Sequence, residues 1–367
     1  MTAGARPRTI LIAPDSFKGS LTSVQVAQAL ANGWARACPN DEIVLSPLAD
    51  GGEGTLEAVA AAGGWTWLTT TVRDPLGRPI PARWLRSDDG TRGVIEMAEA
   101  SGLSRLRVDE RDPLGATTVG TGDLIRAALD AGVRSFVIGI GGSATTDGGR
   151  GLLDALEDAD RRQLAATSVQ LACDVSNPLL GPTGAAATYG PQKGATREDV
   201  ATLDERLGRW ADELDARTGR HERDTPGAGA AGGLGYAFLT IQDRFRSFAL
   251  RPGVELVMEA TGFDDKLSRA DLVITGEGRI DAQTAFGKTA LGVASRAQAA
   301  SVGCVAVGGG VEPEGIDALA AVGAVAVPAT ERPQTVEEAM AGGTAPLERC
   351  GERLARLVDV AGKVGAR

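Results

Sequence analysis

Histidine is the scarcest chemistry-bearing side chain in this sequence of 367 residues. His221 is the only one, and it lies within the polar run GRHERD. Three-histidine zinc sites, HExxH helices and two-histidine iron sites are therefore excluded. If the chain is an enzyme, its general base must be sought among its carboxylates.

Cysteines and long apolar runs are also few. The four cysteines stand far apart at positions 38, 173, 304 and 350, so the CxxC pattern of zinc and thioredoxin-like sites is absent. Scattered thiols of this kind are typical of a reducing cytosol. No apolar run approaches the ~18 residues of a membrane span, and ILIA before Pro14 is too short for a signal peptide. We therefore expect a soluble, cytoplasmic protein with no membrane partner.

Basic residues are outnumbered by acidic ones. The chain has 38 Lys and Arg against 48 Asp and Glu, a net charge of −10. Nucleic-acid binding needs a dominant basic surface, so no nucleic-acid partner is expected. The 43% hydrophobic and 23% charged residues are typical of a globular protein. At roughly 150 residues per domain, the length predicts two domains, or three.

Lysine is rare even among the basic residues, with five lysines against 33 arginines. Three of the five lie beside glycines in loops suited to a ligand: Lys18 in APDSFKGS, Lys193 in YGPQKGA and Lys288 in AFGKT. Lys266 and Lys363 fit exposed helix faces instead. We hypothesise that the lysines in the glycine-rich loops mark functional sites.

Short apolar runs that end in loops rich in glycine and acidic residues recur along the chain. The clearest span residues 9–20, 136–149, 271–281 and 304–310. Because these runs alternate with helix-like segments, they indicate a parallel sheet covered on both faces, and hence an α/β fold. Ligands of such sheets bind beyond the carboxyl ends of the strands, where these loops lie.

The middle of the chain has a different texture. Residues 72–84 are rich in proline, and Asp88-Asp89-Gly90 between two strand-like runs is typical of a β-hairpin. We expect a doubly wound α/β domain formed by residues 1–74 and 264–367, interrupted by a second, inserted α/β domain of residues 75–263. Two domains in simple succession are the alternative.

The glycine- and acid-rich loops hold the groups that phosphoryl transfer requires. That reaction needs N–H groups or cations around phosphates, carboxylates for Mg²⁺, and a base aligned with the acceptor hydroxyl. Each group also has an ordinary explanation, such as a helix cap for Asp15 or a turn for Asp50. Together they are more numerous than turns alone require. The run from Gly139 to Ala144 also fits the GxGxxA variant of a dinucleotide loop, but Asp147 places a carboxylate where a pyrophosphate would lie.

Six long motifs resemble those of the bacterial glycerate kinases. They are APDSFKGSLTS (13–23), PLADGGEGT (47–55), IGIGGSATTDGG (138–149), ACDVSNPLLGPTGAA (172–186), YGPQKGA (189–195) and TGEGRIDAQTAFGKT (275–289). They occur in order and span most of the chain. The resemblance implies two α/β domains, one flavodoxin-like and the other inserted into it. It also implies phosphorylation of D-glycerate with ATP and Mg²⁺, with 2-phosphoglycerate favoured over 3-phosphoglycerate as the product.

Roles within the expected site follow from side-chain chemistry. Lys18 and Lys288 suit phosphate or carboxylate contacts, and Arg279 could hold the carboxylate of glycerate bidentately. Asp281 is the preferred general base because Arg279 and Lys288 are close to it in sequence, although other loop acids compete for that role. We expect catalysis by Asp281, Lys18, Asp174 and Lys288, substrate binding by Asp15, Arg279, Asp50 and Glu53, nucleotide or phosphate contacts from Gly141, Gly142, Ser143, Thr145 and Lys193, and Mg²⁺ ligation by Asp147 and Glu277.

Three other functions remain open on the sequence. The nearest is a kinase for another small hydroxy acid or sugar acid. A dinucleotide-dependent oxidoreductase and a non-catalytic metabolite-binding regulator are more remote. A homo-oligomer is also left open.

Overall fold

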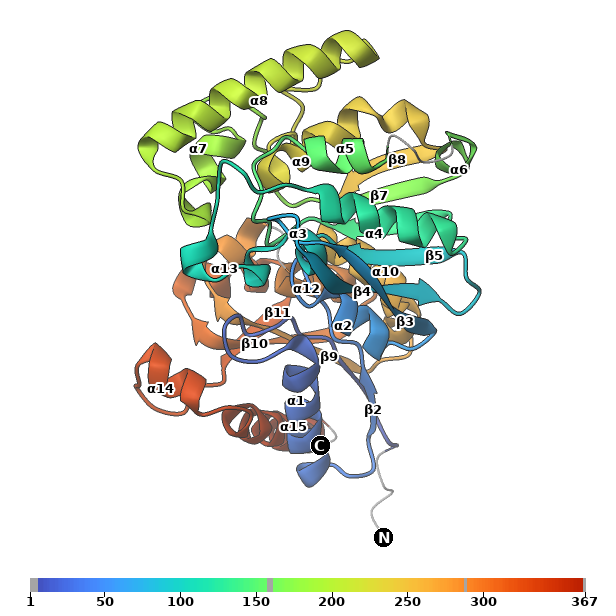
Figure 1. The fold of residues 1–367 in the computed structure, drawn as a ribbon. Helices are drawn as coiled ribbons and strands as arrows, with labels where there is room; N and C mark the ends of the chain where they lie inside the picture. The colour runs from blue at the N-terminus through green and yellow to red at the C-terminus, as the bar shows by residue number, and fades with distance from the viewer. Residues whose placement is uncertain (1–5, 157–160, 287–288, 366–367) are drawn as a thin grey trace. The chain divides into compact units, whose positions relative to one another are not determined.

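The computed structural model describes residues 6–156, 161–286 and 289–365. The chain divides into two compact units. The first consists of residues 1–50, 57–63 and 257–367, and the second of residues 51–56 and 64–256. In Figure 1 the first unit therefore carries both the blue and the red ends of the chain.

A five-stranded, wholly parallel sheet forms the first unit. Its strands are β1 (Thr9–Ile12), β2 (Glu42–Leu45), β9 (Leu272–Ile280), β10 (Gly303–Val311) and β11 (Ala324–Pro328). They are arranged in the order β11-β10-β9-β1-β2. Counted along the chain this is the flavodoxin-like order 2-1-3-4-5. The expected α/β fold, with one sheet built from both chain ends, is confirmed.

Helices cover the first sheet because its central strands are apolar on both faces. Ile10, Leu11 and Ile12 of β1 are all fully buried. Alternate residues of a strand face opposite sides, so both sides need cover. Ile10 and Ile12 pack with α1 (Ser23–Ala37) and α15 (Ala345–Gly365), whereas α12 (Thr289–Ala299) contacts β9 and β10. The remaining helical segments of this unit are α11 (Phe263–Leu267), η5 (Ala282–Phe286), α13 (Pro313–Ala321) and α14 (Val336–Ala341).

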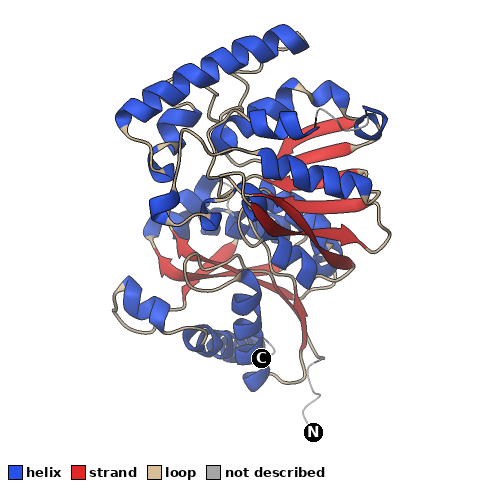
Figure 2. Cartoon of the chain, in the orientation of Figure 1, coloured by secondary structure: helices blue, strands red, loops and turns tan. Residues whose placement is uncertain are grey.

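The second unit is built on a six-stranded mixed sheet. Its strands lie in chain order: β3 (Trp65–Arg73), β4 (Pro79–Ser87), β5 (Arg92–Glu96), β6 (Ser135–Gly139), β7 (Ser168–Ala172) and β8 (Ser247–Arg251). The first three pair antiparallel, and β5 to β8 pair parallel. The expected hairpin at Asp88–Gly90 joins β4 to β5. Figure 2 shows these strands in red, enclosed by blue helices.

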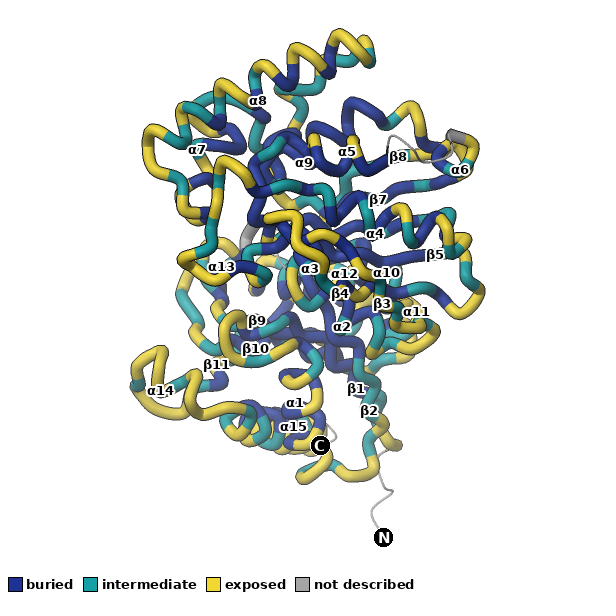
Figure 3. The backbone as a smooth tube through the Cα atoms, in the orientation of Figure 1, coloured by how far each residue is buried: buried dark blue, intermediate teal, exposed yellow. Residues whose placement is uncertain are grey.

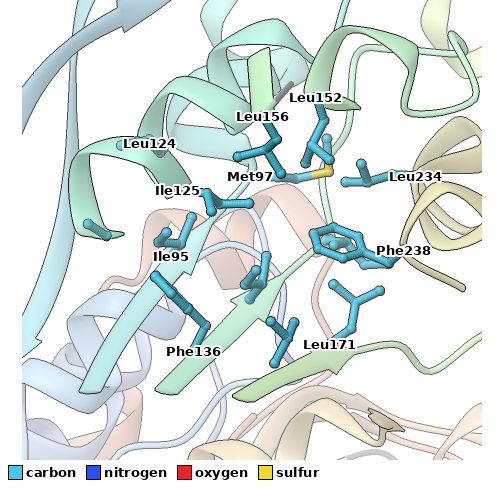
Figure 4. Packing of buried hydrophobic residues seen from close by; sticks show 14 of the residues in the cluster. Ile95, Met97, Leu124, Ile125, Phe136, Leu152, Leu156, Leu171, Leu234 and Phe238 are labelled. Atoms are coloured by element: carbon cyan, nitrogen blue, oxygen red, sulfur yellow. The ribbon is translucent and has the colours of Figure 1, made fainter. Parts of the chain in front are cut away.

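Apolar side chains from strands and helices fill the core of the second unit. Figure 4 shows Ile95, Phe136 and Leu171 of the sheet facing Leu124 of α4 (Val119–Asp130) and Phe238 of α9 (Ala230–Thr240). The long helix α8 (Arg197–Thr218) buries one face and exposes the other, which is yellow in Figure 3. The other helical segments are α3 (Ala98–Ser101), η1 (Leu103–Arg105), η2 (Val108–Glu110), α5 (Arg150–Leu156), α6 (Arg161–Ala165), α7 (Ala185–Tyr189), η3 (Pro191–Lys193) and η4 (Gln242–Arg244). Two more helices, α2 (Thr55–Ala61) and α10 (Gly253–Thr261), cross the divisions between the units.

The division between the units differs from the expected domain boundaries at 74/75 and 263/264. All nine residues of β3, from Trp65 to Arg73, pair with β4. The second unit therefore begins at residue 64, after the short segment 51–56, and ends at residue 256. Within the described parts of the chain, no helix combines the length and apolarity needed to cross a bilayer.

Candidate active site

A cavity of about 740 Å³ opens in the first unit at the carboxyl ends of its strands. Five of the residues expected in the site line it: Asp15, Lys18, Asp50, Glu277 and Arg279. They come from the loops after β1 and β2 and from the end of β9. Since the three strands are parallel neighbours, their ends bring these loops together, as expected for an α/β sheet.

Asp15 is one of two buried acids that line this cavity, with only 7% of its surface exposed. Its Oδ2 accepts a 2.6 Å hydrogen bond from Thr289 Oγ1, and its Oδ1 accepts one from the Ser16 N–H. Burial, followed by the negative charge of Asp50, raises the pKa of Asp15 above its ordinary value. A carboxylate with a raised pKa inside a cavity is suited to accept a proton.

Lys18 lies beside Asp15 on the loop after β1. Its Nζ forms a 2.9 Å ion pair with Asp50 Oδ2, while 75% of the lysine side chain stays exposed. Desolvation lowers the pKa of Lys18, but the charges of Asp50, Asp15 and Glu277 outweigh this effect and leave the pKa raised. Lys18 is therefore a stable cation at the mouth of the cavity.

The end of β9 adds an acid and a cation. Glu277 is 7% exposed and accepts a 2.7 Å hydrogen bond at Oε1 from Thr284 Oγ1. Arg279 is 66% exposed at its side chain and donates from Nε to Glu312 Oε1 at 3.1 Å. Its guanidinium thus points to the solvent side of the cavity, where a carboxylate already contacts it.

Asp281, the preferred base on the sequence, does not line this cavity. Its Oδ1 accepts a 2.8 Å hydrogen bond from the Gln283 N–H, and its Oδ2 lies 3.3 Å from Arg279 Nε. These contacts organise the turn into η5 and orient Arg279. Lys288 lies outside the described residues.

The other expected acids, Glu53, Asp147 and Asp174, belong to the second unit. Glu53 is exposed. Asp174 Oδ1 accepts a 3.0 Å hydrogen bond from the Gly253 N–H.

Asp147 ties together two loops of the second unit. Its Oδ2 accepts hydrogen bonds from the Thr118 N–H and Oγ1, both at 2.8 Å, and from the Gly151 N–H at 3.1 Å. Its Oδ1 accepts a further bond from the Gly149 N–H at 3.1 Å. This carboxylate is occupied by protein donors, which leaves it little capacity for a metal ion.

The glycines of the GGSATTDGG loop are explained by close backbone packing. A Cβ on Gly141 would lie 2.6 Å from Gly52 Cα, too near for a stable contact. Gly142 adopts φ +71°, a left-handed conformation that favours glycine. Ser143 is 7% exposed and pairs with Gly102 in an isolated bridge.

Lys193 is buried rather than presented to solvent, with 1% of its surface exposed. Its Nζ donates a 2.5 Å hydrogen bond to the carbonyl oxygen of Thr145. Desolvation lowers the pKa of Lys193 to about 7, against a smaller opposite effect of Asp147. Among the described side chains, the buried Oγ1 atoms of Thr145 and Thr146 have no hydrogen-bond partner. Through its hydrogen bond to the Thr145 carbonyl, the buried Lys193 anchors the GGSATTDGG loop.

Several residues that line the cavity, or hydrogen-bond to residues that line it, were not anticipated from the sequence. Thr289 and Thr284 orient Asp15 and Glu277, and both lie inside the motif TGEGRIDAQTAFGKT, which could have drawn attention to them. Glu312 carries no comparable signal, and neither does the segment 329–347 that forms one wall. Their positions depend on how α13 and α14 follow the last two strands.

The described residues contain no cluster of three or more His, Cys, Asp or Glu side chains able to hold a metal ion. Mg²⁺ does not require such a cluster, since it is commonly bound through one or two carboxylates together with substrate phosphates. Glu277, a carboxylate on the cavity wall, suits that mode of binding.

Comparisons with known proteins bear on this site. The sequence profile of the glycerate kinase family matches residues 10–160 and 157–359. A glycerate kinase of Bacillus subtilis strain 168 is 41% identical over 96% of this chain and 98% of its own length. The glycerate 2-kinase of Escherichia coli K12 is 39% identical over 85% of this chain and 90% of its own.

A solved structure from Salmonella typhimurium LT2, described as a proposed glycerate kinase 2, superimposes with a TM-score of 0.83. It is 37% identical and covers 97% of this chain and all of its own. Both the sequence and the fold therefore agree with the six motifs. The chain belongs to the glycerate kinase family, and its activity is that of a glycerate kinase, a phosphotransferase.

Proposed function

We propose that the cavity at the ends of β1, β2 and β9 is where this kinase transfers the γ-phosphoryl group of ATP to a hydroxyl of D-glycerate. The observation that carries the proposal is the pairing of a buried acid, Asp15, with an exposed cation, Lys18, on one loop of that cavity. Phosphoryl transfer needs little covalent help from the protein, so positioning and charge supply most of the catalysis.

Asp15 is the general base of this proposal in place of Asp281. The acceptor hydroxyl loses its proton as the new O–P bond forms, and a carboxylate with a raised pKa is suited to receive it. Thr289 fixes the orientation of Asp15 through its hydrogen bond to Oδ2. Asp281 becomes a positioning residue, since it contacts Arg279 and the turn into η5.

The cations divide between the two anionic substrates. Lys18 contacts the phosphoryl group in transfer, because a compact ammonium can follow a moving charge. Arg279 holds the carboxylate of glycerate in a bidentate contact once that carboxylate displaces Glu312. Both act locally against a net charge of −10 that repels anions at a distance.

The proposal includes Mg²⁺, which would bind together with the phosphates of the nucleotide. Glu277 would hold it, together with phosphate oxygens. When bound, the ion neutralises negative charge on the β- and γ-phosphates. Asp147 is not retained as a ligand because its oxygens already accept four hydrogen bonds of 2.8–3.1 Å from Thr118, Gly149 and Gly151.

The second unit contributes a separate prediction. Phosphate contacts by Gly141, Gly142, Ser143 and Thr145 remain proposed on the motif GGSATTDGG, with Lys193 as the residue that positions this loop through the Thr145 carbonyl. Lys288, Glu53 and Asp174 likewise remain candidates on their motifs alone.

The 2-hydroxyl is the proposed acceptor, and the Escherichia coli relative named glycerate 2-kinase supports this choice. The test is ADP release with D-glycerate, L-glycerate, glycolate and tartronate, followed by phosphorus NMR of the product. We expect D-glycerate to be the preferred substrate and 2-phosphoglycerate to be the product. Faster turnover of another acid would favour the alternative of a kinase for a different hydroxy acid, and 3-phosphoglycerate would contradict the regiochemistry.

A further inference from the structure

The cavity of the first unit is much larger than glycerate. An acid of three carbon and four oxygen atoms needs on the order of 200 Å³, at the roughly 30 Å³ that one water molecule takes in the liquid. The cavity measures about 740 Å³, within the ~300–1,000 Å³ of sites for larger organic ligands. Most of its volume is therefore available to a second, bulkier molecule.

The charges that line the cavity are unevenly distributed. The loops after β1 and β2 and the ends of β9 and β10 supply its carboxylates, Asp15, Asp50, Glu277 and Glu312. None of the described lining residues from the segment 329–347 is acidic. This second wall is mainly apolar and small, with Arg332 as its cation. Such a wall suits an uncharged ring better than a phosphate or a carboxylate.

Helix α14 presents an uncovered apolar face to this space. Val336 is 75% exposed and Met340 is 40% exposed, and both line the cavity. They stand four residues apart on one helix, so they share a face. Pockets for organic ligands are lined mainly by apolar side chains with a few polar groups, as this wall is. Figure 3 shows α14 as a largely exposed element.

Met340 also connects the apolar wall to the charged loop. A Cβ on Gly19 would lie 3.2 Å from Met340 Cε, so the methionine reaches the loop next to Lys18. A ligand in contact with Met340 would therefore have one end near Lys18. A purine nucleotide has the matching polarity, because an apolar ring and a chain of phosphates occupy its opposite ends.

We infer that the wall formed by residues 329–347 binds the purine ring of the nucleotide, with Met340 and Val336 against its face and the Gln334 amide at its hydrogen-bonding edge. Gln334 lines the same wall, and a side-chain amide can pair with a ring nitrogen and an amino group of adenine. This inference rests on the proposed function, since it gives the nucleotide a place in the cavity assigned to phosphoryl transfer.

The test separates nucleotide binding from turnover. ADP is titrated calorimetrically into the full-length wild type, Met340→Ala and Gln334→Ala, with Leu357→Ala as the control. Leu357 is 63% exposed on α15 and does not line the cavity. Loss of one apolar contact should weaken ADP binding by ~10-fold in Met340→Ala. Gln334→Ala should also bind ADP more weakly, and Leu357→Ala should bind it as the wild type does.

Steady-state kinetics, which give KM for ATP and for glycerate, provide a second measurement. KM for ATP should rise by ~10-fold in Met340→Ala, while KM for glycerate stays within about 2-fold. Unchanged ADP affinity in both variants, or a rise in the glycerate KM alone, would overturn the inference. The proposed function would be overturned instead if the wild type binds ADP through Met340 and Gln334 but forms no ADP from ATP with any of the four acids tested. If Met340→Ala does not fold, Gln334→Ala carries the test alone.

Discussion

Two residues of this protein show how burial shifts the pKa of an ionisable side chain. Asp15 and Lys193 are both almost completely buried, and in each the neutral form is favoured by desolvation. Asp15 lines a cavity, where a raised pKa suits the proton transfer that we propose. Lys193 faces a backbone carbonyl, where it fixes a loop. Two of the scarce lysines thus occupy different environments: Lys18 lines the cavity on the loop of Asp15, and Lys193 is buried against a backbone carbonyl.

Asp15→Asn should lower the activity of the enzyme and raise its thermal stability. Loss of a general base lowers kcat by ~10²-fold or more. Because the pKa of Asp15 is raised in the folded state, its ionisation opposes folding as pH rises through that pKa. The variant should therefore have a higher Tm than the wild type near neutral pH. The difference should vanish below the ordinary Asp pKa of about 3.9, where Asp15 is protonated in both states.

Thermal unfolding at several pH values, together with ADP release, checks this prediction. Asp130→Asn, at the exposed end of α4, serves as the control and should alter neither quantity. A fully active Asp15→Asn variant would remove Asp15 as the base, and an equal Tm at neutral pH would contradict the raised pKa.

Lys193→Met should change the pH dependence of stability. The folded pKa of about 7 lies below the ordinary lysine value, so the unfolded chain holds more protons between about pH 7 and pH 10. The stability of the wild type relative to the variant should rise across that window, by at most about 1.4 kcal/mol per pH unit. Urea unfolding of both proteins from about pH 6 to pH 9 measures this slope. Lys363→Met, at an exposed ion pair on α15, is the control variant. A stability difference between wild type and Lys193→Met that does not change with pH would mean that Lys193 stays charged.

At the scale of elements, the contact between α1 and α15 depends on two glycines. A Cβ on Gly33 would overlap the backbone oxygen of Glu348, and one on Gly351 would overlap that of Leu30. The two helices therefore cross with their backbones in close contact. This contact closes one face of the parallel sheet, whose strands carry the site at their carboxyl ends.

Gly33→Ala should destabilise the first unit by about 2 kcal/mol, the typical cost of overpacking a close contact. The matched control is Gly362→Ala on α15, where nothing lies within 4 Å of the added Cβ. That substitution should stabilise the protein by ~0.5–1 kcal/mol, because alanine favours a helix more than glycine does. Urea midpoints of the two variants compare them directly, and equal midpoints would argue against the tight crossing.

Strand ends were the most predictable elements of the site. The sequence placed Asp15 and Glu277 at the ends of apolar runs, and parallel neighbours bring such ends together. The strand before Asp50, β2, was not among the expected runs. The position of Asp281 was harder to predict, because its carboxylate accepts a turn hydrogen bond from the Gln283 N–H and does not line the cavity. The burial of Lys193 depends on contacts with residues nearly fifty positions away, which no local pattern encodes. The wall at residues 329–347 lies beyond all six motifs.

At the scale of the whole molecule, the chain alternates between two sheets. β3 illustrates why the division was difficult to predict, since it lies next to the proline-rich stretch yet pairs with β4 along its full length. We predict that a fragment of residues 64–256 unfolds cooperatively on its own. A fragment of residues 75–263 lacks β3, exposes the edge of β4 and should be less stable or aggregate. Urea unfolding and size-exclusion chromatography distinguish the two, and equal behaviour would place the boundary nearer residue 75.

The most direct test of the account compares Lys18→Ala with Lys363→Ala in ADP release driven by D-glycerate. Lys18 lies at the mouth of the cavity beside Asp15, whereas Lys363 forms an exposed ion pair with Asp359 on α15. We predict that Lys18→Ala lowers kcat/KM by ~10²-fold or more and that Lys363→Ala leaves it unchanged. Equal rates for the two variants would contradict the assignment of this cavity to phosphoryl transfer.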